Sequence, residues 1–276
     1  MRNMFLIAGK EIQESLRNRW VLAMTLLLAA LALTLTLLGS APTGNVGVQP
    51  LDVVIVSLSS LGIFLLPLIA LLISHDAIVG EMERGTMLLL LSYPLSRGQL
   101  LAGKFLGHLA MLSFATVFGY GTAALALLAT GTHIDAESWR AYAVVIGSSI
   151  LLGAVFLGLG YLVSAIVRER GTAAGIAIGI WLLLVILYDM GLLAVLVVDQ
   201  GQRISTGALN VLLLLNPTDV YRLLNLAGTA SAGALTGMSG LAKSVSLGAP
   251  ALVATLVLWM LGPLALAAAV FSRREL

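Results

Sequence analysis

Cysteine is absent from this 276-residue chain, and charged residues make up only 10% of it. Without cysteine the chain forms neither a disulfide framework nor a thiolate metal site. A soluble domain carries about a quarter charged residues, so this charge content and the 59% of hydrophobic residues exclude an ordinary soluble protein. The composition therefore predicts a membrane protein.

Long apolar segments with a few turn-rich gaps take the place of a soluble fold. Stretches of 18 or more apolar residues are typical of transmembrane helices, whereas a barrel shows alternating strands of about ten residues. The first stretch begins near Trp20 and is too long for the core of a cleavable signal peptide. We predict an all-α polytopic membrane protein, one transmembrane domain over residues 1–276, with spans at 20–38, 53–74, 105–130, 141–166, 172–198 and 251–271.

The distribution of lysine and arginine predicts the orientation of these spans. An even number of spans places both termini on one side of the membrane. The termini and the loops on that side hold 11 of the 15 Lys and Arg residues, and the other side holds 4. Because positive residues gather in cytoplasmic loops, we expect both termini and the 75–104 loop in the cytoplasm, and the 199–250 segment outside.

Residues 1–19 show a helical repeat ahead of the first span. The apolar residues at three- and four-residue spacing are Phe5, Ala8, Ile12 and Leu16, and the charged ones on another face are Lys10, Glu14 and Arg17. This pattern predicts an amphipathic elbow helix on the inner membrane surface. A basic N-terminus without stable structure is the alternative.

The 75–104 loop contains two predicted helices. Ser96 and Gln99 match a capping box, which predicts a helix that begins at Arg97 and runs into the third span. Upstream, residues 86–92 form a short helix that presents the run Leu88 to Leu91. About one helical turn of leucines is far too short to cross a bilayer, so it predicts a partner-binding surface. Burial of the turn under the lipid headgroups is the alternative.

Two nucleotide-site motifs in this loop are coincidences. Residues 98–104, GQLLAGK, match G-x-x-x-x-G-K, but Phe105 follows where a P-loop needs Ser or Thr, and no strand precedes. Residues 95–99, LSRGQ, resemble the signature sequence of ABC ATPases but overlap this false P-loop. We therefore predict that the chain hydrolyses no nucleotide and is not an enzyme.

The same loop resembles the cytoplasmic loop of ABC-2 type permeases through the pattern E-R-G-T-x-x-x-L-L-x-Y-P-x-S-R-x-x-x-x-x-G-K. In that family the segment between spans two and three is a coupling helix that inserts into a groove of a separate ATPase. The resemblance implies an ATPase-coupling role for Glu83, Arg84, Gly85, Thr86, Met87, Leu88, Leu89, Leu90, Leu91, Tyr93, Pro94 and Arg97. It also implies an elbow helix, six spans and an outer helical segment before the last span, and it implies that ATP and Mg bind to the separate ATPase.

Within that family, the chain most resembles membrane subunits of the transporter for nitrous oxide reductase maturation. This implies a homodimer in the bacterial inner membrane, a NosF-like ATPase, a periplasmic NosD-like protein, and indirect contact with a copper chaperone and the reductase. No cofactor or metal is expected in this chain, because its spans hold no Cys, few Met and no His pair at ligand spacing. Mechanical transmission to the periplasmic partner is thus expected. Export of a sulfur species, lipid or small molecule is the alternative.

The outer segment contains a predicted helix after residue 216. Asn216 is a favourable N-cap, Pro217 suits the first helical position, and Asp219 suits the first turn. Its expected position is the outer membrane surface, where polar side chains would contact a periplasmic partner. These side chains are Asn216, Asp219, Tyr221, Arg222 and Asn225.

Small residues and one acid mark the fourth and fifth spans. The glycines are Gly147, Gly153, Gly158 and Gly160 in span four, and Gly171, Gly175 and Gly179 in span five. Such ladders predict close helix packing, mainly within one bundle, with a subunit interface as the alternative. Asp189 is expected near the outer edge of the bilayer, either solvated there or in an outer vestibule with Tyr188 and Met190.

A metal or enzyme site and a secondary transporter are the alternatives to a permease. A metal or protease site would need the cluster His75, Asp76, Glu81 and Glu83, which falls beside the coupling turn at the inner interface. An intramembrane enzyme would use His75, Glu81, His108 and Asp189, which are expected on opposite membrane faces. A secondary transporter would need an inverted repeat, and the sequence has no convincing one.

Overall fold

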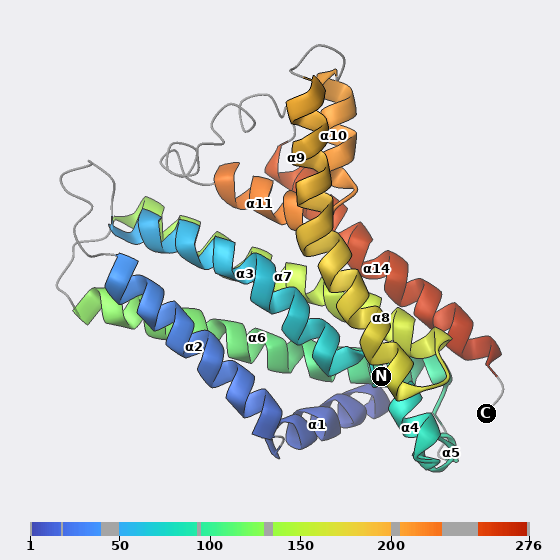
Figure 1. The fold of residues 1–276 in the computed structure, drawn as a ribbon. Helices are drawn as coiled ribbons and strands as arrows, with labels where there is room; N and C mark the ends of the chain where they lie inside the picture. The colour runs from blue at the N-terminus through green and yellow to red at the C-terminus, as the bar shows by residue number, and fades with distance from the viewer. Residues whose placement is uncertain are drawn as a thin grey trace.

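The computed structural model describes residues 2–17, 19–39, 50–92, 95–129, 135–199, 205–227 and 248–274, and regular structure in these ranges is entirely helical. Figure 1 shows a bundle of long helices with both termini at the end that carries α4 and α5. The helices are α1 Arg2–Arg17, α2 Arg19–Gly39, α3 Pro50–Ser74, α4 Val79–Glu83, α5 Thr86–Leu91, α6 Arg97–Ala129, α7 Ala136–Ile166, α8 Arg170–Leu182, α9 Tyr188–Asp199, α10 Thr206–Leu214, α11 Pro217–Ala227 and α14 Ala249–Arg273, with the π-helix η1 Leu183–Leu187 between α8 and α9.

In the described residues, five helical segments are long and apolar enough to cross a membrane, and they correspond to the second to sixth predicted spans. The first predicted span is added only if the pair α1 and α2, which bend by 70° relative to each other, counts as one span. Six spans and an elbow helix on the membrane surface therefore stay predictions. The chain is a multi-pass helical membrane protein.

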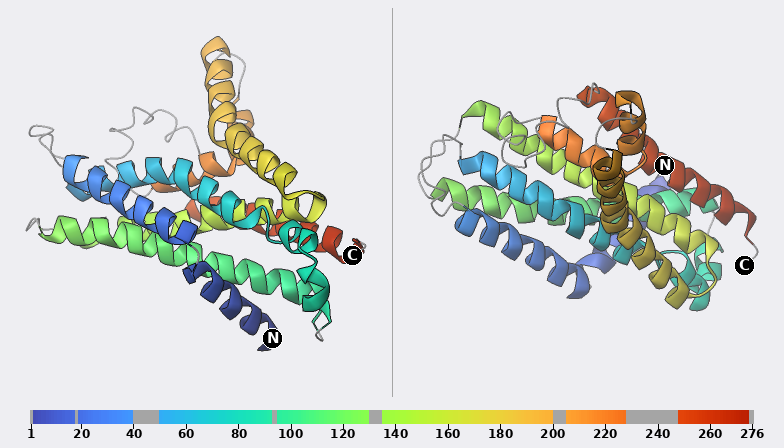
Figure 2. Two further views of the ribbon diagram at one scale, coloured as in Figure 1. Left: turned by 60° about the horizontal axis from the view of Figure 1, so that its bottom comes forward. Right: turned by 45° about the horizontal axis from the view of Figure 1, so that its top comes forward.

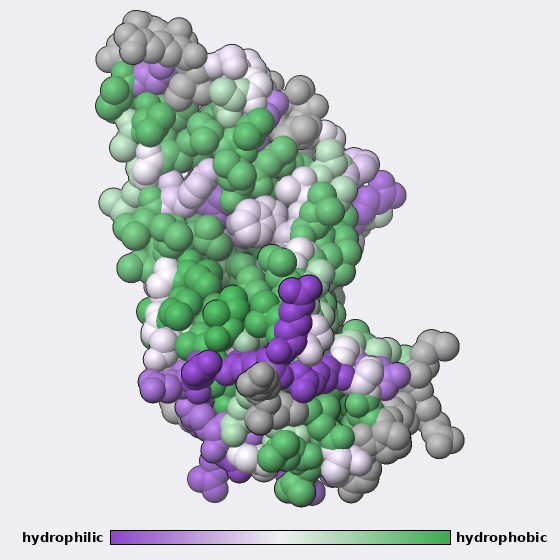
Figure 3. All heavy atoms as spheres, turned by 90° about the vertical axis from the view of Figure 1, so that its right-hand side faces the viewer, coloured by the Kyte–Doolittle hydropathy of each residue, from purple (hydrophilic) through white to green (hydrophobic). Residues whose placement is uncertain are grey.

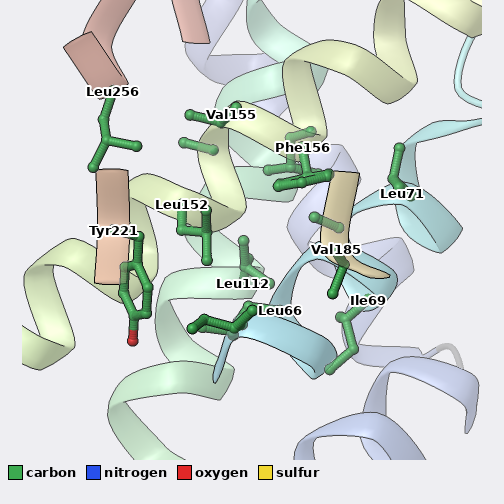
Figure 4. Packing of buried hydrophobic residues seen from close by; sticks show 14 of the residues in the cluster. Leu66, Ile69, Leu71, Leu112, Leu152, Val155, Phe156, Val185, Tyr221 and Leu256 are labelled. Atoms are coloured by element: carbon green, nitrogen blue, oxygen red, sulfur yellow. The ribbon is translucent and has the colours of Figure 1, made fainter. Parts of the chain in front are cut away.

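Helix α7 forms the centre of the bundle. It packs against α3, α6, α11 and α14, and its residues Leu152, Val155 and Phe156 are completely buried. Figure 4 shows them in one apolar cluster with Leu66 of α3 and Leu112 of α6, in which Leu152 lies nearest to Leu112. Since α7 is apolar on all sides, its burial within other helices explains why its sequence lacks an amphipathic repeat.

Three of the four glycines predicted in span four allow close approach within the chain. A Cβ atom on Gly153 would lie 2.2 Å from Leu112, one on Gly158 would lie 2.9 Å from the carbonyl oxygen of Met260, and one on Gly160 would lie 1.9 Å from Ser74 Oγ. The fourth, Gly147, has no such neighbour. Packing within one bundle is thus confirmed for Gly153, Gly158 and Gly160.

The glycines of span five have a different environment. A Cβ atom on Gly171, Gly175 or Gly179 would meet no described atom within 4 Å. Intramolecular packing, the main expectation for this ladder, is wrong, because α8 packs on α3, α4 and α7 through another face and turns its glycines outward. Figures 1 and 2 show α9 projecting away from the other long helices, with α10 beside it. Only 6% of the most apolar part of this segment is buried.

Helix α1 packs on the first turns of α6. Gly103 and Gly107 bring the two backbones together, since a Cβ atom on Gly103 would lie 2.8 Å from Ile7 and one on Gly107 would lie 2.5 Å from Glu11. The predicted apolar residues Phe5 and Leu16 are exposed at 64% and 59%. One face of α1 therefore packs against α6, and another face exposes the apolar side chains of Phe5 and Leu16, as is typical of a helix at a membrane surface.

Candidate functional site

Helix α4 is fastened to the end of α7. The hydroxyl oxygen of Ser164 accepts hydrogen bonds from the backbone N–H groups of Ile78 and Val79, at 2.9 and 3.1 Å. These donors belong to the start of α4, where no earlier carbonyl is available to them. Gly85 then reverses the chain with a φ of 70°, a left-handed conformation suited to glycine. The α4–α5 hairpin is thus a fixed structure.

The leucine run on α5 is divided between the chain and its surroundings. Met87 is buried, whereas Leu88 and Leu89 are exposed at 62% and 68%. Leu90 and Leu91 are half-buried. Two adjacent large apolar side chains thus project from the end of the molecule at which charged residues gather. Figure 3 shows a belt of hydrophilic residues across this lower end and a broad hydrophobic surface above it.

The charged residues predicted to contact the ATPase lie in three different environments. Glu83 accepts a 2.7 Å hydrogen bond from the backbone N–H of Arg170 at the start of α8, and Arg84 is exposed. Arg97 instead points into the chain, where it donates to the carbonyl oxygens of Phe271 and Arg274 at 2.8 and 2.6 Å. Its guanidinium is therefore occupied by the C-terminus of α14, contrary to the expectation that it faces a partner. Tyr93 and Pro94 lie outside the residues that the structure describes.

A second arginine continues this connection. Arg274, just after α14, donates to the carbonyl oxygens of Ala165 and Val167 at 2.7 and 2.6 Å. These groups belong to the end of α7, where the last carbonyls lack helical partners. The start of α6 is thus linked to α14, and α14 to α7, by arginine side chains. The linked ends of these three helices lie at the same end of the bundle as the α4–α5 hairpin.

A buried cluster of charges joins α1, α4 and α6. Lys104 Nζ lies 2.7 Å from Glu11 Oε1 and 2.6 Å from Glu81 Oε1. His108 Nε2 lies 3.4 Å from Glu11 Oε2, and His108 Nδ1 lies 2.8 Å from the Tyr161 hydroxyl. Burial alone would raise the pKa of Glu11, but His108 and Lys104 outweigh it and hold that pKa at about 2.

Sequence reasoning missed this cluster. Lys104 was expected on the helix that begins at Arg97, His108 was a candidate residue for an enzyme, and Glu11 was given no role. The available signal was the position of Glu11, which follows Ile7 and Ala8 on the face of α1 that is buried. A carboxylate on such a face needs a buried cation, and Lys104 stands beside Gly103, where α1 and α6 come close.

The polar residues predicted to contact a periplasmic partner are mostly inside the chain. Helix α11 begins as predicted, with Asn216 Oδ1 accepting from the N–H of Thr218 at 3.2 Å. However, Asn216, Asp219, Tyr221 and Asn225 are at most 5% exposed. Because these groups are already satisfied within the chain, they do not form an exposed docking face, and this part of the expectation is corrected.

The depth of α11 explains this burial. The Tyr221 hydroxyl lies 2.9 Å from Ser149 Oγ, and Ser148 Oγ donates to Asn225 Oδ1 at 3.0 Å. Ser149 lies 13 residues after Ala136, which is ~20 Å along α7 from its outer end. Helix α11 therefore re-enters the bundle and does not lie on the outer membrane surface.

Asp189 is paired on the outer side of the molecule. Its carboxylate accepts from Arg222, which also donates to Asp219 at 2.7 Å. Met190 is exposed and does not share this pairing.

The π-helix η1, which precedes Asp189, is bonded to the start of α11. The backbone carbonyl of Leu184 accepts a hydrogen bond from Asn216 Nδ2 at 2.9 Å. A π-helix leaves a carbonyl unpaired, and Asn216 satisfies it.

Metal-binding geometry is not found in the part of the chain that the structure describes. No group of three or more His, Asp or Glu side chains there is placed to hold an ion. His75 instead bonds to the carbonyls of Leu71 and Leu72. Asp189, on α9, is far along the chain from the Glu81 and His108 cluster and pairs elsewhere, so the four candidates for an intramembrane enzyme are not assembled.

Comparison with known proteins assigns the family. A family profile described as ABC-2 family transporter protein matches residues 5–276. The chain belongs to the ABC-2 transporter family. It is 50% identical to a Pseudomonas aeruginosa protein named "Probable ABC transporter permease protein NosY", over 271 residues and 98% of each chain. A Stutzerimonas stutzeri protein of the same name is 46% identical over 99% of each chain. This ABC-2 chain is thus the permease subunit of an ABC transporter, and such a permease works with an ATPase.

Proposed function

We propose that this permease forms a homodimer in the bacterial inner membrane and transmits ATP-driven motion to a periplasmic partner that serves copper-centre assembly in nitrous oxide reductase. The two relatives named as ABC transporter permeases support the transporter role, and the sequence resemblance supports the specific role. The observation that carries the mechanism is the exposure of Leu88 and Leu89 on a rigid hairpin. Both termini and the hairpin then lie in the cytoplasm, as the distribution of Lys and Arg favours.

The leucine turn is suited to a groove of a NosF-like ATPase. Complete burial of a leucine contributes about 1.5–3 kcal/mol before the cost of ordering, so these two side chains supply a substantial part of an interface. Ser164, Arg170 and Arg97 hold the hairpin and the start of α6 against α7, α8 and α14. Motion of the ATPase would thus move three spans together.

The open face of α8 supports the homodimer. Gly171, Gly175 and Gly179 lie along this helix without intramolecular neighbours, and small residues allow close helix contact between subunits. Mechanical transmission is supported by α11, which connects η1 to α7 and α14. The NosD-like partner would then respond to movement of the outer helices, with copper remaining on the periplasmic side.

The test is the copper content of nitrous oxide reductase from a host that lacks only this chain, complemented with wild type or variants. Leu89→Glu should leave the reductase deficient in copper, because a charge would be buried against the ATPase. Gly98→Glu is the matched control, since Gly98 is exposed and an acid suits the first turn of α6. A fully metallated reductase without the chain would contradict the copper role, and full activity of Leu89→Glu would contradict the coupling role.

A further inference from the structure

A cavity of about 520 Å³ lies between α1, α2, the end of α3, α4, the first turns of α6 and the start of α8. Its volume falls in the range of about 300–1,000 Å³ that is usual for small-ligand sites. Its lining has an apolar part, which includes Val21, Met24 and Ile73, and a charged part, which includes Glu81 and Arg84. An amphipathic cavity of this kind, at the end of a transmembrane bundle, coincides with the level at which lipid headgroups meet acyl chains.

Glu81 supplies a negative charge and a carboxylate oxygen that lacks a hydrogen-bond donor. It is 7% exposed, and its Oε1 atom is bound to Lys104. Its Oε2 atom is buried and has no hydrogen-bond partner among the described residues. Glu11 and Glu81 share the single ammonium of Lys104. A buried carboxylate oxygen without a donor is costly, so the cavity favours a ligand with a cationic N–H group.

Arg84 supplies a positive charge that can bind an anionic group of the ligand. It lines the same cavity, is exposed, and forms no ion pair with a described residue, whereas the neighbouring Arg170 is paired with Asp76 at 2.9 Å. A free guanidinium matches the oxygen atoms of a phosphate group. The cavity therefore combines a site for an amine, a site for a phosphate and an apolar wall.

We propose that this cavity binds a phospholipid with a primary-amine headgroup, phosphatidylethanolamine, from the leaflet on the α4–α5 side. The amine donates to Glu81, the phosphate accepts from Arg84, and the acyl chains extend along Val21, Met24 and Ile73. Phosphatidylcholine has no N–H donor for Glu81, and phosphatidylglycerol has no cationic group. The proposal is independent of the role in reductase maturation.

The test is native mass spectrometry of the full chain, extracted from nanodiscs with equal amounts of phosphatidylethanolamine, phosphatidylcholine and phosphatidylglycerol. Wild type should retain one phosphatidylethanolamine per chain, about tenfold over phosphatidylcholine, since one charge-assisted hydrogen bond supplies about 1.4 kcal/mol. Glu81→Gln should reduce this preference severalfold. Arg84→Gln should instead reduce the retention of all three lipids severalfold, because each of them carries the phosphate that Arg84 contacts. Arg17→Gln removes the same charge as Arg84→Gln from an exposed residue that does not line the cavity, and it should bind as wild type does.

Two results would overturn the proposal. One is equal retention of the three lipids by wild type. The other is unchanged retention of phosphatidylethanolamine by Arg84→Gln, which alters an exposed side chain and leaves the buried cluster intact. Competition with glycerophosphoethanolamine tests whether the acyl chains contribute to binding, because this compound carries the headgroup without acyl chains. If it displaces the lipid at equal concentration, the apolar wall adds nothing and the ligand is a soluble phosphoamine.

Discussion

Lys104 of α6 and Glu81 of α4 form an ion pair of 2.6 Å in which both side chains are more than 90% buried. Through Glu11 the same lysine also holds α1. One ammonium thus connects the elbow helix, the α4–α5 hairpin and the third span. The hairpin that faces the proposed ATPase surface is therefore supported by charge pairing inside the bundle.

Replacing Lys104 with methionine should destabilise the chain strongly. Lys104→Met keeps much of the side-chain volume but leaves Glu11 and Glu81 buried without their cation, which costs about 3–5 kcal/mol. The melting temperature in detergent should fall by roughly 10 °C. Lys10→Met is the control, because the Lys10–Glu14 pair is exposed and contributes at most about 1 kcal/mol. Equal melting of the two variants would show that the buried pairing does not contribute to stability.

Acid should weaken the same cluster over a defined range of pH. The pKa of Glu11 is about 2 in the folded chain and 4.5 as a free group. A depressed pKa stabilises the fold above the unfolded value, so this contribution is complete above pH ~5 and is lost as the pH falls toward 2. It amounts to about 3 kcal/mol. Melting curves of detergent-solubilised wild type between pH 6 and 3 should show this decrease.

The corresponding variant isolates Glu11. Glu11→Gln should begin from lower stability at pH 6 and lose less than wild type on acidification, because its amide does not titrate. If both proteins lose the same stability between pH 6 and 3, other carboxylates are responsible for the acid sensitivity.

Local features of the fold were predictable from the sequence. The capping box at Ser96 and Gln99 is present, with hydrogen bonds of 3.3 and 3.2 Å in the two directions. The short helix after Gly85 and the start of α11 at Pro217 also agree with the structure. These features depend on residues within one or two helical turns, so their sequence patterns are sufficient to predict them.

Long-range pairings were not predictable in the same way. Glu11 and Lys104 are 93 residues apart, and a single charge in an elbow helix resembles a solvated one until the helix is placed. The depth of α11 likewise depends on Ser148 and Ser149, two serines within an apolar helix that carry no periodic signal. The outward face of α8 depends on where the whole helix lies, which its glycine spacing does not specify.

Gly158 should tolerate alanine poorly. A Cβ atom at this position would lie 2.9 Å from the backbone carbonyl oxygen of Met260, so α14 would have to move away from α7. We expect Gly158→Ala to destabilise the chain by about 1–3 kcal/mol. Gly147→Ala, on the same helix with open space around its Cβ position, should be neutral or slightly stabilising. Melting temperatures in one detergent compare the two, and indistinguishable values would contradict close packing of α7 and α14.

Gly85→Ala tests whether the geometry of the hairpin, as well as its leucines, matters for binding the ATPase. At a φ of 70° alanine costs about 1–2 kcal/mol, and the hairpin can relieve this strain by rotating α5 relative to α4. Leu88 and Leu89 would then leave their positions although neither is changed. Co-purification with the ATPase subunit should fall severalfold, whereas Gly98→Ala, which meets no neighbour and has no such φ, should bind fully. Full binding by Gly85→Ala would mean that the ATPase recognises the leucines whatever their orientation.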